Sequence, residues 1–275
     1  MKSDFSPRHC GLDTQSPPLH NELAISLVQY SPVWEDVSGN LSRLSRIVSQ
    51  LEGRGDLILL PEMFSTGFST NTNVICTPKN QSTVLEWMRQ TAQSTGSLIA
   101  GSVAVEENTV CYNRFYWVGA DGSSGHYDKN YLFIMSDEPK YFTAGTEKKQ
   151  FEWRGWKIKP IICYDLRFPE LCRNTRNNPY DILVCVASWP SVRSDVWLTL
   201  LKARAIENQC YAIGVNRVGE DGNGLQHKGD TIVYSPKGET IVRLPENEEK
   251  SATIGLSLSK LKAFRQKFPV LEDIV

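Results

Sequence analysis

Short runs of almost wholly apolar residues recur along this chain, and segments with helical spacing lie between them. Such runs are typical of strands buried on both faces, in sheets that are covered by helices. The alternation therefore predicts an α/β sandwich with buried sheets. The expected strands are 23–29, 56–61, 97–105, 112–119, 156–163, 180–188, 211–217, 230–235 and 240–244, and the expected helices are 40–51, 82–95, 169–176 and 196–207.

Residues 1–22 differ from the rest of the chain, because they are rich in Pro, Ser, His and charge and show no periodicity. We interpret them as a flexible N-terminal tail. Residues 23–275 are expected to form one domain, since the composition does not break near the midpoint and 275 residues suit one large domain.

The net charge and the hydropathy of the chain argue against nucleic-acid and membrane partners. A formal net charge of −1 gives no electrostatic case for a nucleic acid or an anionic membrane. The sequence contains no apolar stretch near the ~20 residues of a membrane span, and its first residues lack the apolar centre of a secretory signal. We therefore expect a cytoplasmic protein.

The seven cysteines are odd in number and form no CxxC pair. This pattern predicts neither a disulfide framework nor a zinc site, and it disfavours a thiol–disulfide redox protein. Cys172, Cys185 and Cys210 lie within helix or strand patterns and are interpreted as packing groups.

Cys163 differs from these, because it follows the apolar run 158–162 directly and polar residues come next. Open α/β sheets bind ligands at the carboxyl ends of their strands. A thiolate is a strong nucleophile, and a cysteine at that position can face a bound ligand. Glu62 likewise follows an apolar run, Lys129 lies just beyond the strand-like segment 112–119, and Glu138 comes nine residues later. Each is a weak signal alone, since Glu and Lys are usually solvated, but the combination predicts a catalytic site.

The segments around these residues, 60–63, 127–133 and 162–169, resemble the three signature segments of the carbon–nitrogen hydrolase (nitrilase) superfamily. The likeness runs from Leu23 to Ile274 and is closest to the bacterial omega-amidase branch, which deamidates 2-oxoglutaramate and 2-oxosuccinamate. Two departures, Asn130-Tyr131 for Arg-His and Ser188 for Asn, avoid the catalytic positions but affect pocket shape.

This resemblance implies a four-layer α-β-β-α sandwich and a homodimer or higher homo-oligomer. It also implies a cysteine-dependent amidohydrolase that acts on a small-molecule amide through a thioester, without cofactor or metal. The alternatives are a nitrilase, a carbamoylase or another small-amide hydrolase, and a non-catalytic binding module that keeps the fold.

The chemistry assigns a role to each residue. Cys163 would attack the carbonyl carbon and Glu62 would be the general base. Lys129 would favour the thiolate and stabilise the oxyanion, together with the backbone N–H of Tyr164. In the family a second glutamate orients these groups, and Glu138 matches that position.

The substrate-binding residues are less constrained by the sequence. Arg167 would pair with the distal carboxylate of the substrate, or would instead hold Asp165 or a subunit interface by an ion pair. Phe68, Phe133, Tyr164 and Trp189 are expected to wall the pocket or to belong to the core. Arg204 and Glu207 lie three apart on one helix and are interpreted as a structural ion pair. Neither His126 nor His227 has a metal-ligand partner nearby in sequence.

Overall fold

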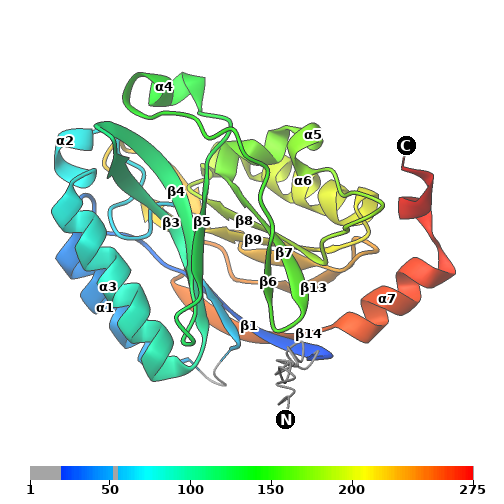
Figure 1. Ribbon diagram of the computed structural model, residues 1–275. Coiled ribbons are helices and arrows are strands. Elements are labelled where there is room, and N and C mark those ends of the chain that lie inside the picture. The colour runs from blue at the N-terminus through cyan, green and yellow to red at the C-terminus, as the bar shows by residue number, and fades with distance from the viewer. Residues whose placement is uncertain (1–19, 52–54, 275) are drawn as a thin grey trace, which may run out of the picture.

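Two six-stranded mixed sheets pack face to face in the computed structural model, which describes residues 20–51 and 55–274 (Figure 1). In order across the first sheet lie β14 (Lys250–Ser257), β1 (Glu22–Gln29), β2 (Leu57–Leu59), β3 (Leu98–Glu107), β4 (Val110–Val118) and β5 (Ser124–Asp128). In order across the second lie β13 (Thr240–Arg243), β12 (Ile232–Tyr234), β9 (Tyr211–Asn216), β8 (Ile182–Ala187), β7 (Trp156–Ile162) and β6 (Phe151–Trp153). A separate pair consists of β10 (Val218–Glu220) and β11 (Gln226–Lys228).

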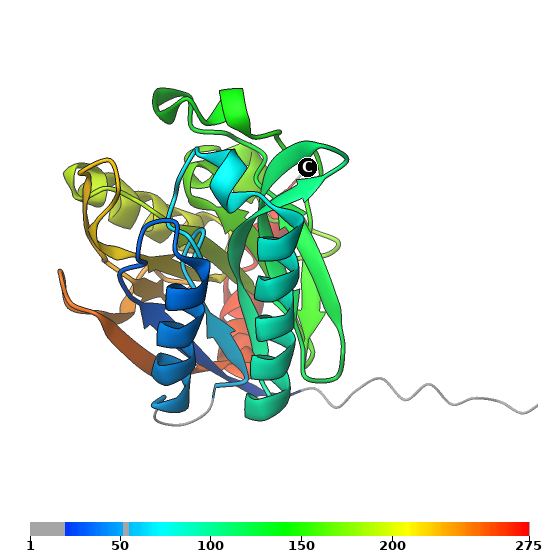
Figure 2. The same cartoon turned by 90° about the vertical axis from the view of Figure 1, so that its left-hand side faces the viewer.

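Each large sheet has three parallel strands at its centre, β1-β2-β3 in one and β7-β8-β9 in the other, and antiparallel strands outside them. Helices α1 (Val37–Ser49) and α3 (Pro78–Thr95) lie side by side on the outer face of the first sheet (Figure 2). Helix α6 (Ser194–Glu207) covers the outer face of the second (Figure 1). The fold is therefore the predicted four-layer α-β-β-α sandwich.

The remaining elements are short, apart from the last helix. They are α2 (Thr72–Ile75), α4 (Glu138–Tyr141), α5 (Pro169–Cys172) and α7 (Leu258–Lys267), with the 3₁₀ turns η1 (Ile134–Ser136), η2 (Cys163–Arg167), η3 (Ser191–Arg193) and η4 (Val270–Asp273).

Period-2 alternation along the central strands divides the core into three layers. On β8, Ile182, Val184 and Val186 face the other sheet, whereas Leu183 and Cys185 face α6. All five are buried. Because both faces of these strands are covered, the sequence there is a continuous apolar run, and this is why the strands were predictable.

The structure corrects several boundaries predicted from the sequence. Helices α1 and α3 begin three and four residues earlier than expected, since Asp36 and Thr77 cap them by accepting the N–H groups of Gly39 and Asn80. Helix α5 ends at Cys172, not at residue 176. Strands β5, β6, β10, β11 and β14 were not predicted. The hairpin β12–β13 is confirmed.

Most of the predicted N-terminal tail, residues 1–19, lies outside the described residues. Its last residues are held against the sandwich. The N–H of His20 donates to the carbonyl of Arg154, the indole of Trp156 donates to the carbonyl of His20, and β1 begins at Glu22.

The prediction that the cysteines form no disulfide is wrong, because Cys76 and Cys111 are bonded to each other. Cys76 follows α2 and Cys111 lies on β4, 35 residues later. Sequence spacing reveals local CxxC pairs but not pairs that a sheet brings together, so this one had no sequence signal. Cys172, Cys185 and Cys210 are free and buried, as predicted.

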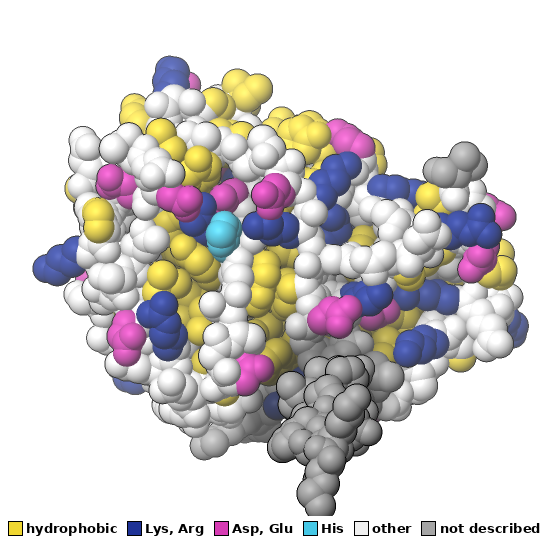
Figure 3. All heavy atoms as spheres, viewed as in Figure 1, with side chains coloured by type: hydrophobic (Ala, Val, Ile, Leu, Met, Phe, Trp, Pro, Cys, Tyr) yellow, Lys and Arg dark blue, Asp and Glu magenta, His cyan; other side chains and the backbone are white. Residues whose placement is uncertain are grey.

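Lys, Arg, Asp and Glu side chains are interspersed on the face shown in Figure 3, as the net charge of −1 suggests. Within residues 20–51 and 55–274, no helix combines the length and the apolar character needed to cross a bilayer.

Candidate active site

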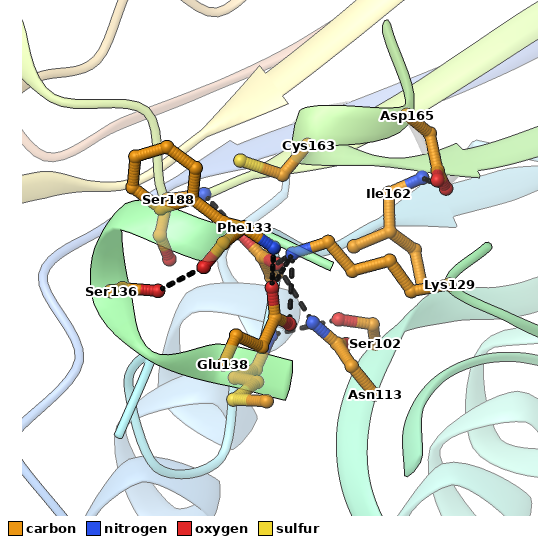
Figure 4. Close-up of polar contacts among 12 residues, drawn as sticks. Ser102, Asn113, Lys129, Phe133, Ser136, Glu138, Ile162, Cys163, Asp165 and Ser188 are labelled. Carbon is orange, nitrogen blue, oxygen red and sulfur yellow. Dashed lines mark hydrogen bonds and ion pairs between the residues drawn. The ribbon is translucent and has the colours of Figure 1, made fainter. Parts of the chain in front are cut away.

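Cys163 stands at the junction between β7 and η2, where the carboxyl end of a central parallel strand turns sharply. Its φ of +46° lies in the left-handed region, which is strained for a residue with a Cβ atom. Such strain is tolerated only where neighbouring contacts hold it. In Figure 4 the sulfur is directed towards the Phe133 ring, and Cys163 lines the same pocket as Glu62 and Lys129.

Asp165 supplies these contacts. Its fully buried carboxylate accepts the N–H of Ile162 at 2.9 Å, the hydroxyl of Tyr127 at 2.8 Å and the N–H of Tyr131 at 2.8 Å. Ile162 precedes Cys163, and Tyr127 and Tyr131 flank Lys129. One carboxylate therefore ties the cysteine turn to the lysine segment, and sequence analysis did not assign it this role.

We expect Asp165→Asn to lower kcat about 10- to 100-fold with little change in KM, because the amide NH₂ must face one of three donors and shift the turn. Steady-state kinetics of ammonia release measures this split. The exposed Asp273→Asn is the matched control and should match wild type. If Asp165→Asn retained full kcat, Asp165 would not position the thiol.

The same variant should flatten the pH dependence of stability. Burial raises the pKa of Asp165 to about 6, above the value of about 3.9 expected in the unfolded chain. The unfolded chain therefore loses this proton first, and the contribution of Asp165 to stability falls as pH rises from about 4 to 6. Urea unfolding across this window should show less decline in Asp165→Asn than in wild type.

Lys129 follows β5 and lies between two carboxylates (Figure 4). Its Nζ donates to Glu62 Oε1 at 3.0 Å and to the Glu138 oxygens at 3.0 and 2.9 Å. All three side chains are at most 1% exposed. Burial alone would lower the pKa of Lys129, but Glu138, Glu62 and Cys163 outweigh it and raise the pKa well above its usual value. Lys129 is therefore a fixed cation.

Glu62 is held by three donors. Besides Lys129, the Asn113 side-chain amide donates to Oε1 at 2.8 Å and the Ser188 N–H donates to Oε2 at 2.8 Å. Ser188 follows β8, so adjacent parallel strands deliver Ser188 and Cys163 to one sheet edge. Glu62 comes from the opposite sheet, just beyond β2.

Glu138 lies behind Lys129 and does not line the pocket. It accepts the N–H of Phe133 in addition to the ammonium of Lys129. Glu138 therefore holds the Lys129 ammonium in position.

The Cys163 thiol has a pKa raised well above its usual value, first by burial and then by the Glu62 carboxylate, with Lys129 opposing both. The resting group at neutral pH is therefore the thiol, which needs a base before it can attack. Glu62 is the carboxylate beside it.

Cys163, Glu62 and Lys129 line one pocket. Three residues that are far apart in the sequence therefore lie together in the fold. The four aromatic residues expected to wall the pocket do line it, namely Phe68, Phe133, Tyr164 and Trp189, and so does Arg167. The Lys129 ammonium lies 5.1 Å from the centre of the Phe68 ring. The enclosed space is about 70 Å³, which suits a small acyl chain rather than a protein substrate.

One alternative for Arg167, an ion pair with Asp165, is not formed, because the Asp165 oxygens accept from other groups. Its guanidinium lies over the rings of Trp189 and Tyr164, at 5.2 and 6.0 Å. By contrast, the predicted structural ion pair Arg204–Glu207 is confirmed at 3.0 Å.

Sequence analysis missed several pocket residues. Arg193, Asp221 and His227 line the pocket, and Asn113 holds Glu62 from β4. Ser188, noted only as a departure from the family sequence, also lines the pocket. His227 was noted only as lacking metal-ligand neighbours. Ser188 and Arg193 lie beyond the end of β8, where the strand prediction alone would direct attention.

The four-layer sandwich, with a cysteine, a lysine and a glutamate at one pocket and a second glutamate behind the lysine, defines the class of hydrolases that cleave carbon–nitrogen bonds. The carbon–nitrogen hydrolase family model matches residues 24–266. The chain therefore belongs to the carbon–nitrogen hydrolase family, and it is an enzyme that hydrolyses carbon–nitrogen bonds other than peptide bonds.

Individual relatives agree with this assignment. The chain is 43% identical to the omega-amidase YafV of Escherichia coli K12 over 91% of this chain and 96% of the relative. It is 31% identical to the 2-oxoglutaramate amidase of Bacillus subtilis, with the same coverages. A crystal structure of a CN-hydrolase superfamily protein from Xanthomonas campestris, with an arsenic adduct in its active site, is 38% identical and superposes with a TM-score of 0.88. That match covers 93% of this chain and 98% of the other.

Proposed function

We propose that this enzyme hydrolyses the omega-amide of small keto-dicarboxylic acid monoamides, 2-oxoglutaramate and 2-oxosuccinamate, to the keto acid and ammonia. The observation that carries the proposal is the convergence of Cys163, Glu62 and Lys129 on a small aromatic pocket that is also lined by two arginines. The names of the relatives at 43% and 31% identity support the choice of substrate.

In the first half of the reaction, Glu62 takes the thiol proton as the Cys163 sulfur attacks the amide carbon. The charge that develops on the carbonyl oxygen is stabilised by Lys129 and by the N–H of Tyr164. Tyr164 is the second residue of η2, so its N–H has no partner within that turn. Glu62 then returns the proton to the leaving nitrogen, the C–N bond breaks, and ammonia leaves a thioester on Cys163.

In the second half, a water molecule enters where ammonia left. Glu62 takes its proton as the oxygen attacks the thioester carbon, and the C–S bond breaks to release the acid. The proton passes from Glu62 to the sulfur, which restores the thiol. Lys129 keeps its proton throughout, as its strongly raised pKa requires.

The distal end of the substrate is assigned to Arg167. A guanidinium matches a carboxylate with two parallel hydrogen bonds. The Arg167 guanidinium packs over the rings of Trp189 and Tyr164. These contacts hold its plane in a fixed orientation for binding the substrate carboxylate.

Ammonia release from a panel of compounds tests the substrate. We expect 2-oxoglutaramate and 2-oxosuccinamate to exceed neutral aliphatic amides, nitriles and carbamoyl compounds by about 100-fold or more in kcat/KM, because the half-buried guanidinium of Arg167 loses a charged hydrogen bond when the substrate has no carboxylate. A nitrile or carbamoyl compound as the best substrate would replace the proposal with the corresponding alternative.

A cytoplasmic location and a homodimer or larger assembly remain predictions. Analytical sedimentation would test the assembly.

The Cys76–Cys111 bond offers a test of the location. Free thiols can be counted by alkylation in protein isolated from its own cell, and the count shows whether these two cysteines are joined there.

A further inference from the structure

A second arginine, Arg193, lines the pocket. It is the last residue of η3 and lies directly before α6. The side chain is half-buried, and its guanidinium lies 5.4 Å from the centre of the Phe133 ring. Its position is therefore set by the backbone of η3 and by an aromatic ring of the pocket wall.

Neither Arg167 nor Arg193 has a carboxylate partner among the described residues. The fully buried Arg217 has none either, but its guanidinium donates to the carbonyls of Val218 and Glu220, and other buried or half-buried arginines form ion pairs. Arg114 pairs with Asp128 at 2.6 Å, and Arg265 pairs with Asp181 at 2.9 Å. A half-buried guanidinium that faces a cavity and forms no ion pair is suited to an anionic ligand.

The aromatic wall connects the two guanidiniums. Phe133, under Arg193, and Tyr164, under Arg167, have ring centres 5.1 Å apart. The indole N–H of Trp189, the other ring under Arg167, donates to the carbonyl of Arg193 at 2.8 Å. Both guanidiniums therefore pack on one contiguous group of aromatic rings, formed by Phe133, Tyr164 and Trp189.

Charge is distributed unevenly in the pocket. At its inner end Lys129 is outnumbered by Glu62 and Glu138, which disfavours an anion beside the reacting carbonyl. Another pocket carboxylate, Asp221, accepts the N–H groups of Asn223 and Leu225 at 2.8 and 3.0 Å. A substrate with a neutral amide at one end and a carboxylate at the other fits this polarity in one orientation.

We infer that Arg193 is a specificity-determining residue that binds the oxo-acid end of the substrate together with Arg167. This inference rests on the proposed function and deepens it. The two guanidiniums form a clamp on the carboxylate and the adjacent keto oxygen, and they select omega-amides of 2-oxo acids over neutral amides.

The test compares wild type with Arg193→Met, which keeps an unbranched side chain but removes the charge. Substrates are 2-oxoglutaramate, glutaramate (the same chain without the keto group) and pentanamide (no charge). We expect kcat/KM to fall about 10- to 100-fold for the two carboxylate-bearing amides, mostly through KM, and to stay within about threefold for pentanamide. Arg89→Met, on the exposed surface of α3, is the matched control and should change none of them.

The outcomes separate the two proposals. If wild type does not prefer 2-oxoglutaramate to pentanamide, the proposed function and this inference both fail. If wild type shows the preference and Arg193→Met keeps it, only the role of Arg193 is refuted.

A binding measurement keeps the test decisive if turnover of Arg193→Met is too low to follow. Pentanoate, which carries a carboxylate at one end only, should protect the Cys163 thiol of wild type from iodoacetamide. The pentanoate concentration needed should rise about 10-fold or more in Arg193→Met and partly recover in Arg193→Lys. Equal protection in wild type and Arg193→Met would overturn the inference.

Discussion

Cys163→Ala is expected to abolish amide hydrolysis, by about 10⁵-fold or more, and to leave the fold intact. The sulfur is the atom that would form the thioester, and neither Glu62 nor Lys129 can replace it as a nucleophile. Removing one sulfur at the edge of a cavity costs little packing, because the site already faces open space. Ammonia release measures the first effect, and thermal unfolding measures the second.

The matched control for this variant is Cys185→Ala. Cys185 lies on the neighbouring strand β8, with its sulfur 4.0 Å from the carbonyl oxygen of Cys163, and it is a fully buried thiol. Burial raises its pKa strongly, so it should stay inert as a nucleophile. Cys185→Ala should lose some stability through the cavity but retain turnover. Activity of Cys163→Ala above a tenth of wild type would refute the thioester mechanism.

The central strands were predictable from the sequence because each is covered on both faces. Residues 182–187 are all buried, and a strand in that setting must be apolar throughout. Strand β14 was not predicted, because it lies at the edge of its sheet. Most of its residues are half-buried or exposed, so its sequence carries no apolar run.

The residues proposed to react follow predicted strands, so the sequence indicated them, but it did not indicate the residues that hold them in place. Asn113 lies in the middle of β4 and Asp165 in a turn, and neither local pattern indicates that its side chain reaches another segment. Arg193 follows a predicted strand, but the sequence does not show which side of the pocket η3 faces. Such contacts follow from tertiary packing rather than from local sequence.

Lys129→Met is expected to destabilise the protein by about 3–5 kcal/mol as well as to remove activity. The change leaves Glu62 and Glu138, both almost fully buried, without the cation that separates them. For a chain of this size the loss corresponds to a fall in Tm of about 10 °C. Differential scanning calorimetry at pH 8 measures it, and the exposed Lys140→Met, which removes a surface ion pair with Asp137, is the matched control and should shift Tm little.

Two further measurements assign this loss to charge rather than to packing. Repulsion between two buried carboxylates is relieved when one takes up a proton, so the gap in unfolding free energy between Lys129→Met and wild type should narrow as pH falls from 8 to 5. The double variant Lys129→Met/Glu138→Gln removes one of the two charges and should recover much of the stability at pH 8, yet stay inactive because the oxyanion still lacks its cation. A gap that stays constant with pH, and a double variant no more stable than Lys129→Met, would mean that Lys129 stabilises the site by filling space and not by its charge.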